Sequence, residues 1–353
     1  MANKALLEKL RKSSTIKIAD VVSESTFFND KDSIPFSIPM LNVAFSGDPD
    51  IGFVPGLTTW AGPSKHFKTM FSLLQAKAYM DKYPDAILLF YDSEFGTPKA
   101  YFKSLGIDMD RVFHTPITDV EQLKFDLMNQ LQNIQRGDRV FILVDSVGNL
   151  ASKKEVEDAL AEKSTADMTR AKQLKSLGRM ITPHLTIKDI PMTVVNHTYK
   201  TLEMFSKDVV GGGTGIYYSS DNIFILGRQQ DKEGQGAEAE LNGWKFIINI
   251  EKSRYVREKT KIPIVVDFES GISKYSGLLD LAIELSIVVK PKNGWYQIVG
   301  EEKLWRRADT NSEAFWGPVF KNTDFKARIR EQYQLGTGAM IQYDDASDTE
   351  ADE

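Results

Sequence analysis

The feature that most constrains the fold is a series of short, continuously apolar segments that alternate with helix-like segments from residue 56 onward. Parallel strands have this unbroken apolar pattern because their connecting helices bury both faces of the sheet. Strands are expected at 56–62, 86–92, 139–146 and 192–197, and helices at 68–80, 119–135 and 167–181. The pattern predicts a doubly wound α/β core with a mainly parallel, twisted sheet.

After residue 220 the pattern changes. The apolar segments NIFILGRQQ, WKFIINIEKS and IPIVVDFES follow one another with no helix between them. Short connections suit antiparallel neighbours, whereas parallel strands need a long crossover. We therefore expect an antiparallel extension at one edge of the sheet, with the core ending near residue 275.

The first 33 residues precede the core and are predicted to contain two short helices, at 4–12 and 18–28. Leu6, Leu7 and Leu10 share one face of the first helix. An apolar face of this kind can pack on the core of its own chain or dock on a neighbouring subunit. The second interpretation makes residues 1–33 an oligomerisation segment.

Residues 276–340 are predicted to form a small C-terminal α+β domain. We expect a helix at 277–289, a hairpin flanked by Trp295 and Trp305, and a last helix near 323–334. The last ten residues carry six acidic groups and no basic group, so residues 341–353 are predicted to be a disordered acidic tail. Such a tail can merely aid solubility, or it can compete with nucleic acid for a basic groove.

Composition excludes several kinds of chemistry. The chain has no cysteine and four histidines, so disulfides, thiolate zinc ligands and a cysteine nucleophile are ruled out. No apolar run approaches about 18 residues and no secretory leader follows the start, which predicts a cytoplasmic protein without membrane contact. The net charge is −5, but residues 1–343 hold 43 acidic and 44 basic residues. The body of the protein can therefore carry basic patches for nucleic acid.

The segment GPSKHFKT, residues 62–69, lies between a predicted strand and a predicted helix. It matches the phosphate-binding pattern G-x-x-x-x-G-K-[ST], except that Phe67 replaces the second glycine. In such a loop the backbone amides face phosphate, Lys68 neutralises its oxygens and Thr69 holds Mg²⁺. The predicted nucleotide-binding residues here are Gly62, Pro63, Ser64, Lys65, His66, Phe67, Lys68, Thr69 and Met70.

Two carboxylates end predicted strands beside this loop. Asp145 ends the strand FILVD and is expected to be the second partner of Mg²⁺, although an Asp at this position can also cap the following segment. Glu94 follows the strand at 86–92 and is predicted to be the general base that polarises the attacking water. Together with the loop, these residues predict an ATP site that uses Mg²⁺.

Longer motifs support a narrower assignment. The segments FYDSEFG, ILVDSVGNLASKKE, VVNHTY, GGGTG and PKNGWY occur in this order. In sequence and spacing they resemble the UvsX recombinases, the bacteriophage branch of the RecA family, from about Ser13 to about Leu335. The resemblance implies a RecA-type ATPase core over residues 34–275. That phage group also carries a phenylalanine in the phosphate loop, in agreement with Phe67.

The resemblance implies roles for further residues. Ser146 would join Asp145 at the metal-binding strand end, and Tyr101 would stack on the adenine. His197 stands where bacterial RecA proteins have a glutamine that senses the γ-phosphate and signals to the DNA loop. A histidine can donate the same hydrogen bond, but it can also titrate near neutral pH. Without the resemblance, His197 also fits a hydrogen-bonded residue at a strand end.

Lys252 and Arg254 match a basic pair that, in the family, reaches the ATP of the neighbouring subunit. The resemblance implies that this pair supplies transition-state charge in trans, as arginine fingers do. Hydrolysis would then depend on filament assembly. Without the resemblance, the pair fits an ordinary solvated charge cluster.

Two segments are expected to contact DNA. One is the polar loop 151–165 with the helix after it, whose buried face is predicted to include Met168. The other is the loop 198–215, where lysines would bind phosphates, aromatic side chains would stack on bases and glycines would allow close approach. From the residues alone this loop also fits a mobile lid. The predicted DNA-binding residues are Arg170, Lys172, Lys175, Arg179, Tyr199, Lys200, Phe205, Lys207, Gly211, Gly212 and Gly213.

The resemblance implies an ATP-dependent recombinase that forms a helical filament on single-stranded DNA and exchanges strands with homologous double-stranded DNA. It would act in phage recombination, replication and repair, with a single-strand-binding protein and a recombination mediator as further partners. Two alternatives are a ring helicase motor with the RecA fold and a noncatalytic mediator. No added helicase domain is visible, and both Lys68 and Glu94 are retained.

Overall fold

The computed structural model describes residues 3–25, 31–162, 168–201, 208–233 and 240–336. Within these ranges one sheet holds nine strands in the order β11-β10-β9-β8-β1-β5-β4-β2-β3. Neighbours from β8 to β3 pair in parallel, and neighbours from β8 to β11 are antiparallel. The strands are β1 Leu57–Ala61, β2 Ile87–Asp92, β3 Val112–Pro116, β4 Val140–Asp145, β5 Met192–Asn196, β8 Asn222–Glu233, β9 Glu240–Lys252, β10 Lys261–Asp267 and β11 Gly271–Ile272. The predicted parallel core with an antiparallel edge is confirmed.

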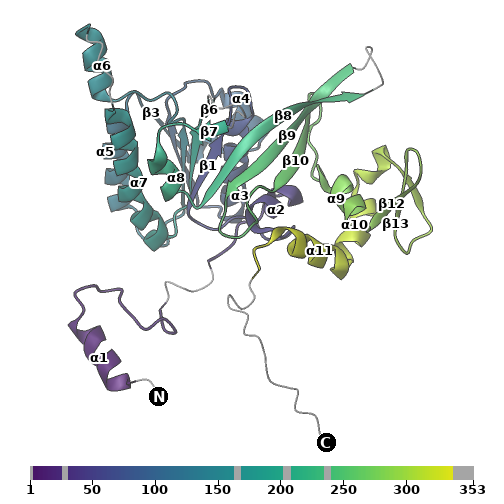
Figure 1. Ribbon diagram of the computed structural model, residues 1–353, viewed down its shortest axis with the longest axis horizontal. Coiled ribbons are helices and arrows are strands. Elements are labelled where there is room, and N and C mark those ends of the chain that lie inside the picture. The colour runs from purple at the N-terminus through teal and green to yellow at the C-terminus, as the bar shows by residue number, and fades with distance from the viewer. Residues whose placement is uncertain (1–2, 26–30, 163–167, 202–207, 234–239, 337–353) are drawn as a thin grey trace, which may run out of the picture.

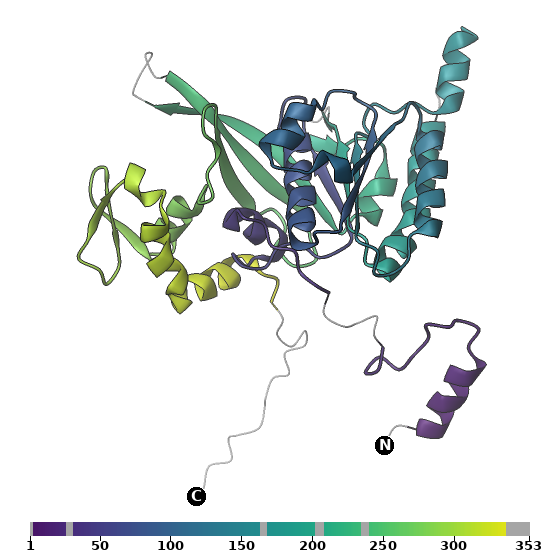
Figure 2. The same cartoon turned by 180° about the vertical axis from the view of Figure 1, so that it is seen from behind.

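Helices cover both faces of the parallel part of the sheet (Figures 1 and 2). On one face lie α5 (Val120–Asn133), α7 (Thr169–Lys188) and the short α8 (Thr214–Ser219). α7 packs there because Leu174, Leu177 and Ile181 recur at helical spacing and are fully buried. On the other face lie α3 (Lys68–Lys82) and α2 (Pro39–Ser46). Every residue of α2 is buried.

The C-terminal part contains α9 (Leu278–Glu284), α10 (Glu313–Lys321) and α11 (Thr323–Tyr333). They pack beside a separate sheet of β12 (Val288–Lys292), β13 (Trp295–Ile298) and β14 (Leu304–Arg306), so Trp295 and Trp305 lie on neighbouring strands. Smaller elements are α4 (Lys99–Ser104), the hairpin of β6 (Thr198–Lys200) and β7 (Asp208–Val210), and 3-10 turns at Met109–Arg111 and Ala308–Thr310.

Three local predictions were wrong. Residues 18–25 form turns, not a helix, and the Asp20 carboxylate accepts a hydrogen bond from the Val21 amide, a contact that favours a turn over a helix. The helix predicted at 277–289 ends at Glu284, because the β-branched residues that follow enter β12. The loop 151–165 contains α6 (Lys153–Leu160), which begins with a capping box.

The N-terminal helix α1 (Lys4–Ser13) has no buried residue and lies apart from the core in both views (Figures 1 and 2). Leu6, Leu7 and Leu10 are 49%, 38% and 56% exposed. The interpretation in which this face packs on its own core is therefore wrong, and docking on a neighbouring subunit stays a prediction. In the ranges that the structure describes, no helix is long and apolar enough to cross a bilayer.

Candidate nucleotide site

The phosphate loop connects β1 to α3 at the edge of the sheet where the parallel strands end. α3 begins at Lys68, so its first backbone amides face the loop. The Lys68 side chain crosses the loop, and its Nζ donates a hydrogen bond to the Pro63 carbonyl oxygen at 2.9 Å. Burial lowers the pKa of this ammonium group, against the opposing effect of the Glu94 and Asp145 carboxylates. The loop therefore holds the partly desolvated ammonium group of Lys68, which can bind phosphate oxygens.

Phe67 adopts the backbone conformation that its glycine counterpart would adopt freely. Its φ is 64° and its ψ 17°, in the left-handed region. The ring stacks on Phe246 of β9 at 5.0 Å between centroids and meets Phe71 edge-on at 5.7 Å. Aromatic packing against the extension thus compensates for backbone strain in the phosphate loop.

Replacing Phe67 by alanine is expected to destabilise the protein more than replacing it by glycine. Both variants lose the ring contacts, but only glycine relieves the left-handed strain, which is worth about 1 kcal/mol. Urea unfolding of the wild type and both variants measures the difference. An alanine variant as stable as the glycine variant would show that residue 67 is not strained.

Asp145 ends β4 beside α3. The Thr69 hydroxyl donates to Asp145 Oδ2 at 2.7 Å, whereas the buried Oδ1 has no hydrogen-bond partner among the described residues. Burial raises the pKa of the Asp145 carboxyl to about 6. Mg²⁺ prefers oxygen ligands and is usually bound by one or two protein groups together with phosphates of the substrate. Thr69 and the unpaired oxygen of Asp145 fit such an ion.

Replacing Asp145 by asparagine is expected to stabilise the nucleotide-free protein at pH 8. Above pH 6 the carboxylate is ionised in the folded and unfolded states, so the folded state carries its desolvation cost. A pKa raised from 3.8 to about 6 corresponds to about 3 kcal/mol, less the cost of burying an amide. The gain should shrink as pH falls toward 4, where the folded carboxyl is protonated and the unfolded one, with its ordinary pKa of 3.8, is close to half protonated. Urea unfolding at both pH values, with the exposed Asp85→Asn as control, checks this; a less stable variant at pH 8 contradicts it.

Three side chains hold Glu94 in place. Its Oε1 accepts hydrogen bonds from Ser146 Oγ at 2.7 Å and Asn149 Nδ2 at 3.2 Å, and lies 3.1 Å from His197 Nε2. The bond from His197, followed by that from Ser146, lowers the pKa of Glu94 to about 2 despite partial burial. A carboxylate with so low a pKa is a weak proton acceptor, but it is ionised and can orient water by hydrogen bonding.

A cavity of 410 Å³ joins these groups. Its walls include residues 64–70, Glu94, Tyr101 of α4, Asp145 and His197, all of them predicted from the sequence. The sequence interpretation missed the contribution of the antiparallel extension, namely Arg228, Trp244, Phe246, Val266 and Phe268. The Arg228 guanidinium lies 4.0 Å over the Trp244 ring and donates to the Lys65 carbonyl oxygen at 3.1 Å. The extension therefore forms one wall of the site.

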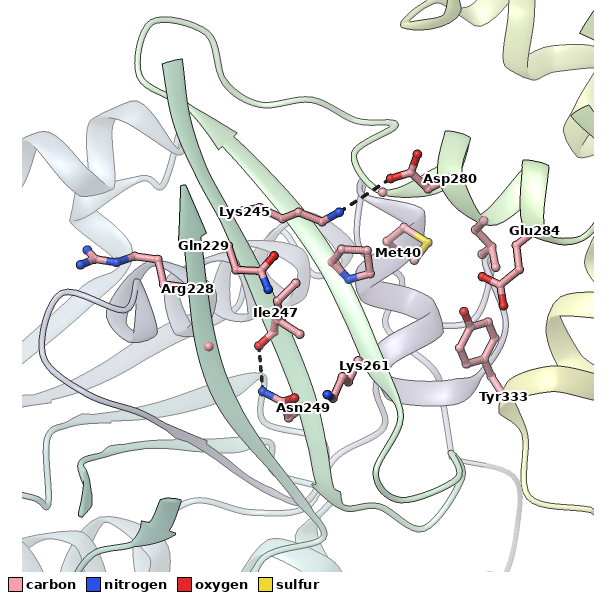
Figure 3. A pocket seen from close by; sticks show the side chains of 14 residues that line it. Met40, Arg228, Gln229, Lys245, Ile247, Asn249, Lys261, Asp280, Glu284 and Tyr333 are labelled. Carbon is pink, nitrogen blue, oxygen red and sulfur yellow. Dashed lines mark hydrogen bonds and ion pairs between the residues drawn. The ribbon is translucent and has the colours of Figure 1, made fainter. Parts of the chain in front are cut away.

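A second cavity, of 520 Å³, lies between the extension, α9 and α11 (Figure 3). Lys245, Ile247 and Asn249 of β9 face it, alternating with residues that face the core. Lys245 Nζ lies 3.8 Å from Asp280 Oδ2 across the cavity. Of the described residues that line it, none was predicted as a site residue, so the first cavity is the candidate nucleotide site.

The structure brings the two predicted DNA-binding segments together. Lys172, Lys175 and Arg179 are exposed on α7, and Tyr199 and Lys200 are exposed on β6. The glycine segment lies against α7: a Cβ added at Gly212 would be 2.9 Å from Leu174 Cδ1, and one added at Gly213 would be 3.5 Å from Ala171 Cβ. Gly211 donates its backbone N–H to the His197 carbonyl oxygen at 2.8 Å.

Other residues of these segments lie differently. Met168 was predicted on the buried face, but it is 68% exposed because it precedes the first turn of α7. The Arg170 guanidinium donates to the carbonyl oxygens of Val147, Gly148 and Leu150 at 2.6–2.8 Å, so it braces the loop after β4. Its contact with DNA stays a prediction. Phe205 and Lys207 lie outside the described residues.

The basic pair Lys252 and Arg254 lies near the N-terminal ends of β1 and β8, whereas the phosphate loop lies at the C-terminal end of β1. Lys252 pairs with Ile223 near the start of β8, and its Nζ donates to the Tyr217 and Tyr218 carbonyl oxygens at 3.2 Å. Arg254 Nε lies 2.6 Å from Asp221 Oδ1, just before β8. Since β8 runs parallel to β1, both residues lie where β1 begins, and the loop follows its other end.

This combination of a phosphate loop, strand-end carboxylates and a parallel sheet with an antiparallel edge defines an α/β protein with the RecA-type core. The chain is 52% identical over 341 residues, 94% of its length, to the recombination and repair protein of Enterobacteria phage T4, of which it covers 86%. It therefore belongs to the UvsX group of phage recombination and repair proteins within the RecA family.

Other comparisons agree. Residues 275–329 match the family described as "Bacteriophage T4, Recombination and repair protein, C-terminal domain". The chain is 24% identical over 341 residues to protein RecA of Acholeplasma laidlawii, covering 95% of the chain and 96% of that protein. It is 25% identical over 273 residues to protein RecA of Borreliella afzelii, covering 76% and 72%.

Proposed function

We propose that this protein is an ATP-dependent recombinase that forms a filament on single-stranded DNA and exchanges strands with homologous double-stranded DNA. The observation that carries the proposal is the cavity in which Lys68, Thr69, Asp145 and Glu94 converge. Phosphoryl transfer needs positioning and charge stabilisation rather than covalent chemistry, and these groups are of the types that supply both.

In the proposed site the loop amides and Lys68 bind the phosphates of ATP, and Tyr101, which lines the same cavity, stacks on the adenine. Thr69 and Asp145 hold Mg²⁺, which neutralises phosphate charge when it is bound. Glu94 orients the attacking water through its ionised carboxylate. Ser146, Asn149 and His197 keep that carboxylate in one position, because each contacts the same oxygen.

The position of Lys252 and Arg254 supports hydrolysis at subunit interfaces. The pair and the phosphate loop of one chain lie at opposite ends of the parallel strands. The pair is therefore not placed to contact a nucleotide bound by its own chain. In a head-to-tail assembly the pair of one subunit can face the γ-phosphate bound by the next. It would supply positive charge to the transition state there.

A connected set of contacts supports coupling between the nucleotide and DNA. Glu94 contacts the His197 side chain, and the His197 carbonyl oxygen accepts the Gly211 N–H. The Asn196 side chain also binds this segment, by donating to the Gly211 carbonyl oxygen at 2.9 Å. A γ-phosphate that displaces His197 from Glu94 would thus pull on the glycine segment beside α7.

The DNA contacts that we propose are independent of base sequence. Lys172, Lys175, Arg179 and Lys200 bind phosphates, and Tyr199 stacks on a base. Homology is then recognised by base pairing and not by protein side chains. A single-strand-binding protein and a recombination mediator are the expected partners, in the cytoplasm of the infected bacterium.

The test is ATP hydrolysis by the wild-type protein with and without single-stranded DNA, combined with electron microscopy of the DNA complex and a strand-exchange assay with homologous double-stranded DNA. Strong stimulation, helical filaments and strand exchange together support the proposal. Hydrolysis that does not respond to DNA contradicts it, closed rings favour a helicase motor, and filaments without strand exchange favour a mediator.

A further inference from the structure

Asp92 is a buried carboxylate, 3% exposed, that ends β2 beside the nucleotide site. Its Oδ1 accepts hydrogen bonds from the backbone amides of Glu94 at 3.1 Å and Phe95 at 2.8 Å. Phe95 has a left-handed φ of 53°, so the chain turns sharply at this point. The Asp92 carboxylate therefore fixes the turn that presents Glu94 to the cavity.

The second oxygen of Asp92 faces the neighbouring strand. Oδ2 lies 3.2 Å from Nε2 of His114 on β3, where His114 pairs with Phe90 in the parallel ladder. A hydrogen on Nε2 makes this contact a hydrogen bond. The two side chains differ in exposure, at 5% for Asp92 and 48% for His114. His114 thus connects a buried carboxylate to the outer side of the sheet edge.

The surroundings of Asp92 make its contact with His114 important. Asp145 is its register partner on the other neighbouring strand, so a second carboxylate lies close by. A buried acceptor that loses its donor is costly, and a carboxylate free to rotate would move away from the like charge. Loss of the His114 contact would therefore disturb the bonds from Asp92 Oδ1 to the Glu94 turn.

We propose that His114 is a positioning residue for ATP hydrolysis, which acts by holding Asp92 and, through it, the turn that carries Glu94. This inference rests on the function proposed above. His114 touches neither the phosphate loop nor the 410 Å³ cavity. Its effect should therefore fall on the hydrolysis step and leave ATP binding unchanged.

The structure offers a specific way to separate this role from simple packing. The His114 ring lies 5.4 Å from the Phe90 ring, so His114→Phe can keep an aromatic contact while it removes the donor. His114→Gln places an amide N–H near the position of Nε2. A cavity of 550 Å³ is lined by both His114 and Asp92, and it is large enough for imidazole to enter in His114→Ala.

The first experiment measures hydrolysis in the presence of single-stranded DNA. His114→Phe should lower kcat by at least about 10-fold, since displacing a catalytic group by about 1 Å costs on the order of 10²-fold, with KM for ATP unchanged. His114→Gln should retain most of the wild-type rate, and imidazole should restore part of the rate of His114→Ala. An unchanged kcat in His114→Phe, or equal losses in the Phe and Gln variants without imidazole rescue, overturns the inference.

The second experiment does not depend on hydrolysis. Hydrogen exchange of the Glu94 and Phe95 amides in the nucleotide-free protein should be about 10-fold faster in His114→Phe and close to wild type in His114→Gln. Identical exchange in all three proteins overturns the inference. A wild-type protein that does not hydrolyse ATP would contradict the proposed function instead, while the exchange data still decide the role of His114.

Discussion

Replacing Glu94 by glutamine is expected to abolish DNA-stimulated ATP hydrolysis, with kcat falling by at least about 10²-fold. Glutamine keeps the shape of the side chain, and its carbonyl oxygen can still accept bonds from Ser146 and Asn149. It lacks the negative charge that lies near Lys68 and that, in the proposed mechanism, orients water. ATP binding should persist, because the phosphate loop, Thr69 and Asp145 are unchanged.

Steady-state hydrolysis with and without single-stranded DNA, together with binding of a fluorescent ATP analogue, tests this expectation. Glu302→Gln is a suitable control, because Glu302 is exposed and precedes β14, outside the residues that line the cavity. Hydrolysis by Glu94→Gln at the wild-type rate would rule out Glu94 as the water-orienting group. Loss of nucleotide binding would show instead that its charge is needed to assemble the site.

The second large effect is expected from replacing both Lys252 and Arg254 by alanine. Removing transition-state charge supplied by a neighbouring subunit should lower hydrolysis by about 10³-fold. Nucleotide binding by separate subunits should change little, because both residues lie at the opposite ends of the parallel strands from the phosphate loop. Lys259→Ala, which removes an exposed cation nearby that pairs with Glu251, is the control for a general loss of charge.

Mixing variants tests the composite site directly. Subunits with Lys68→Ala lack a working phosphate loop, and subunits with the double substitution lack the basic pair. A mixture should regain activity at interfaces where the intact halves meet, although neither variant is active alone. A mixture without activity, formed from subunits that still assemble, would contradict action in trans.

Much of the site could be predicted because the fold forces it together. Parallel strands end at the same edge of a sheet, so a phosphate loop after β1 and carboxylates after β2 and β4 must meet. The unbroken apolar pattern of these strands allowed the parallel topology to be predicted from the sequence. The roles of single residues, including His197 and Tyr101, came from the family resemblance.

The other features of the site depend on strand registers and long-range contacts, which cannot be predicted from the sequence alone. Whether Trp244 and Phe246 face the 410 Å³ cavity depends on the pairing of β8 with β9, which shifts at two irregular positions. The stacking of Phe67 on Phe246 joins residues far apart in the chain. Arg170 is one cation among several on α7, and its three carbonyl acceptors were not visible before the fold was known.

The separation of Lys252 and Arg254 from the phosphate loop would also give the proposed assembly a direction. If each complete site needs the loop of one subunit and the basic pair of the next, the contact is heterologous and the polymer is open-ended. One terminal subunit then binds nucleotide that it cannot hydrolyse, and the subunit at the other end presents a basic pair that faces no nucleotide. Turnover per subunit would rise with filament length, and the two ends would differ in how readily they gain and lose subunits.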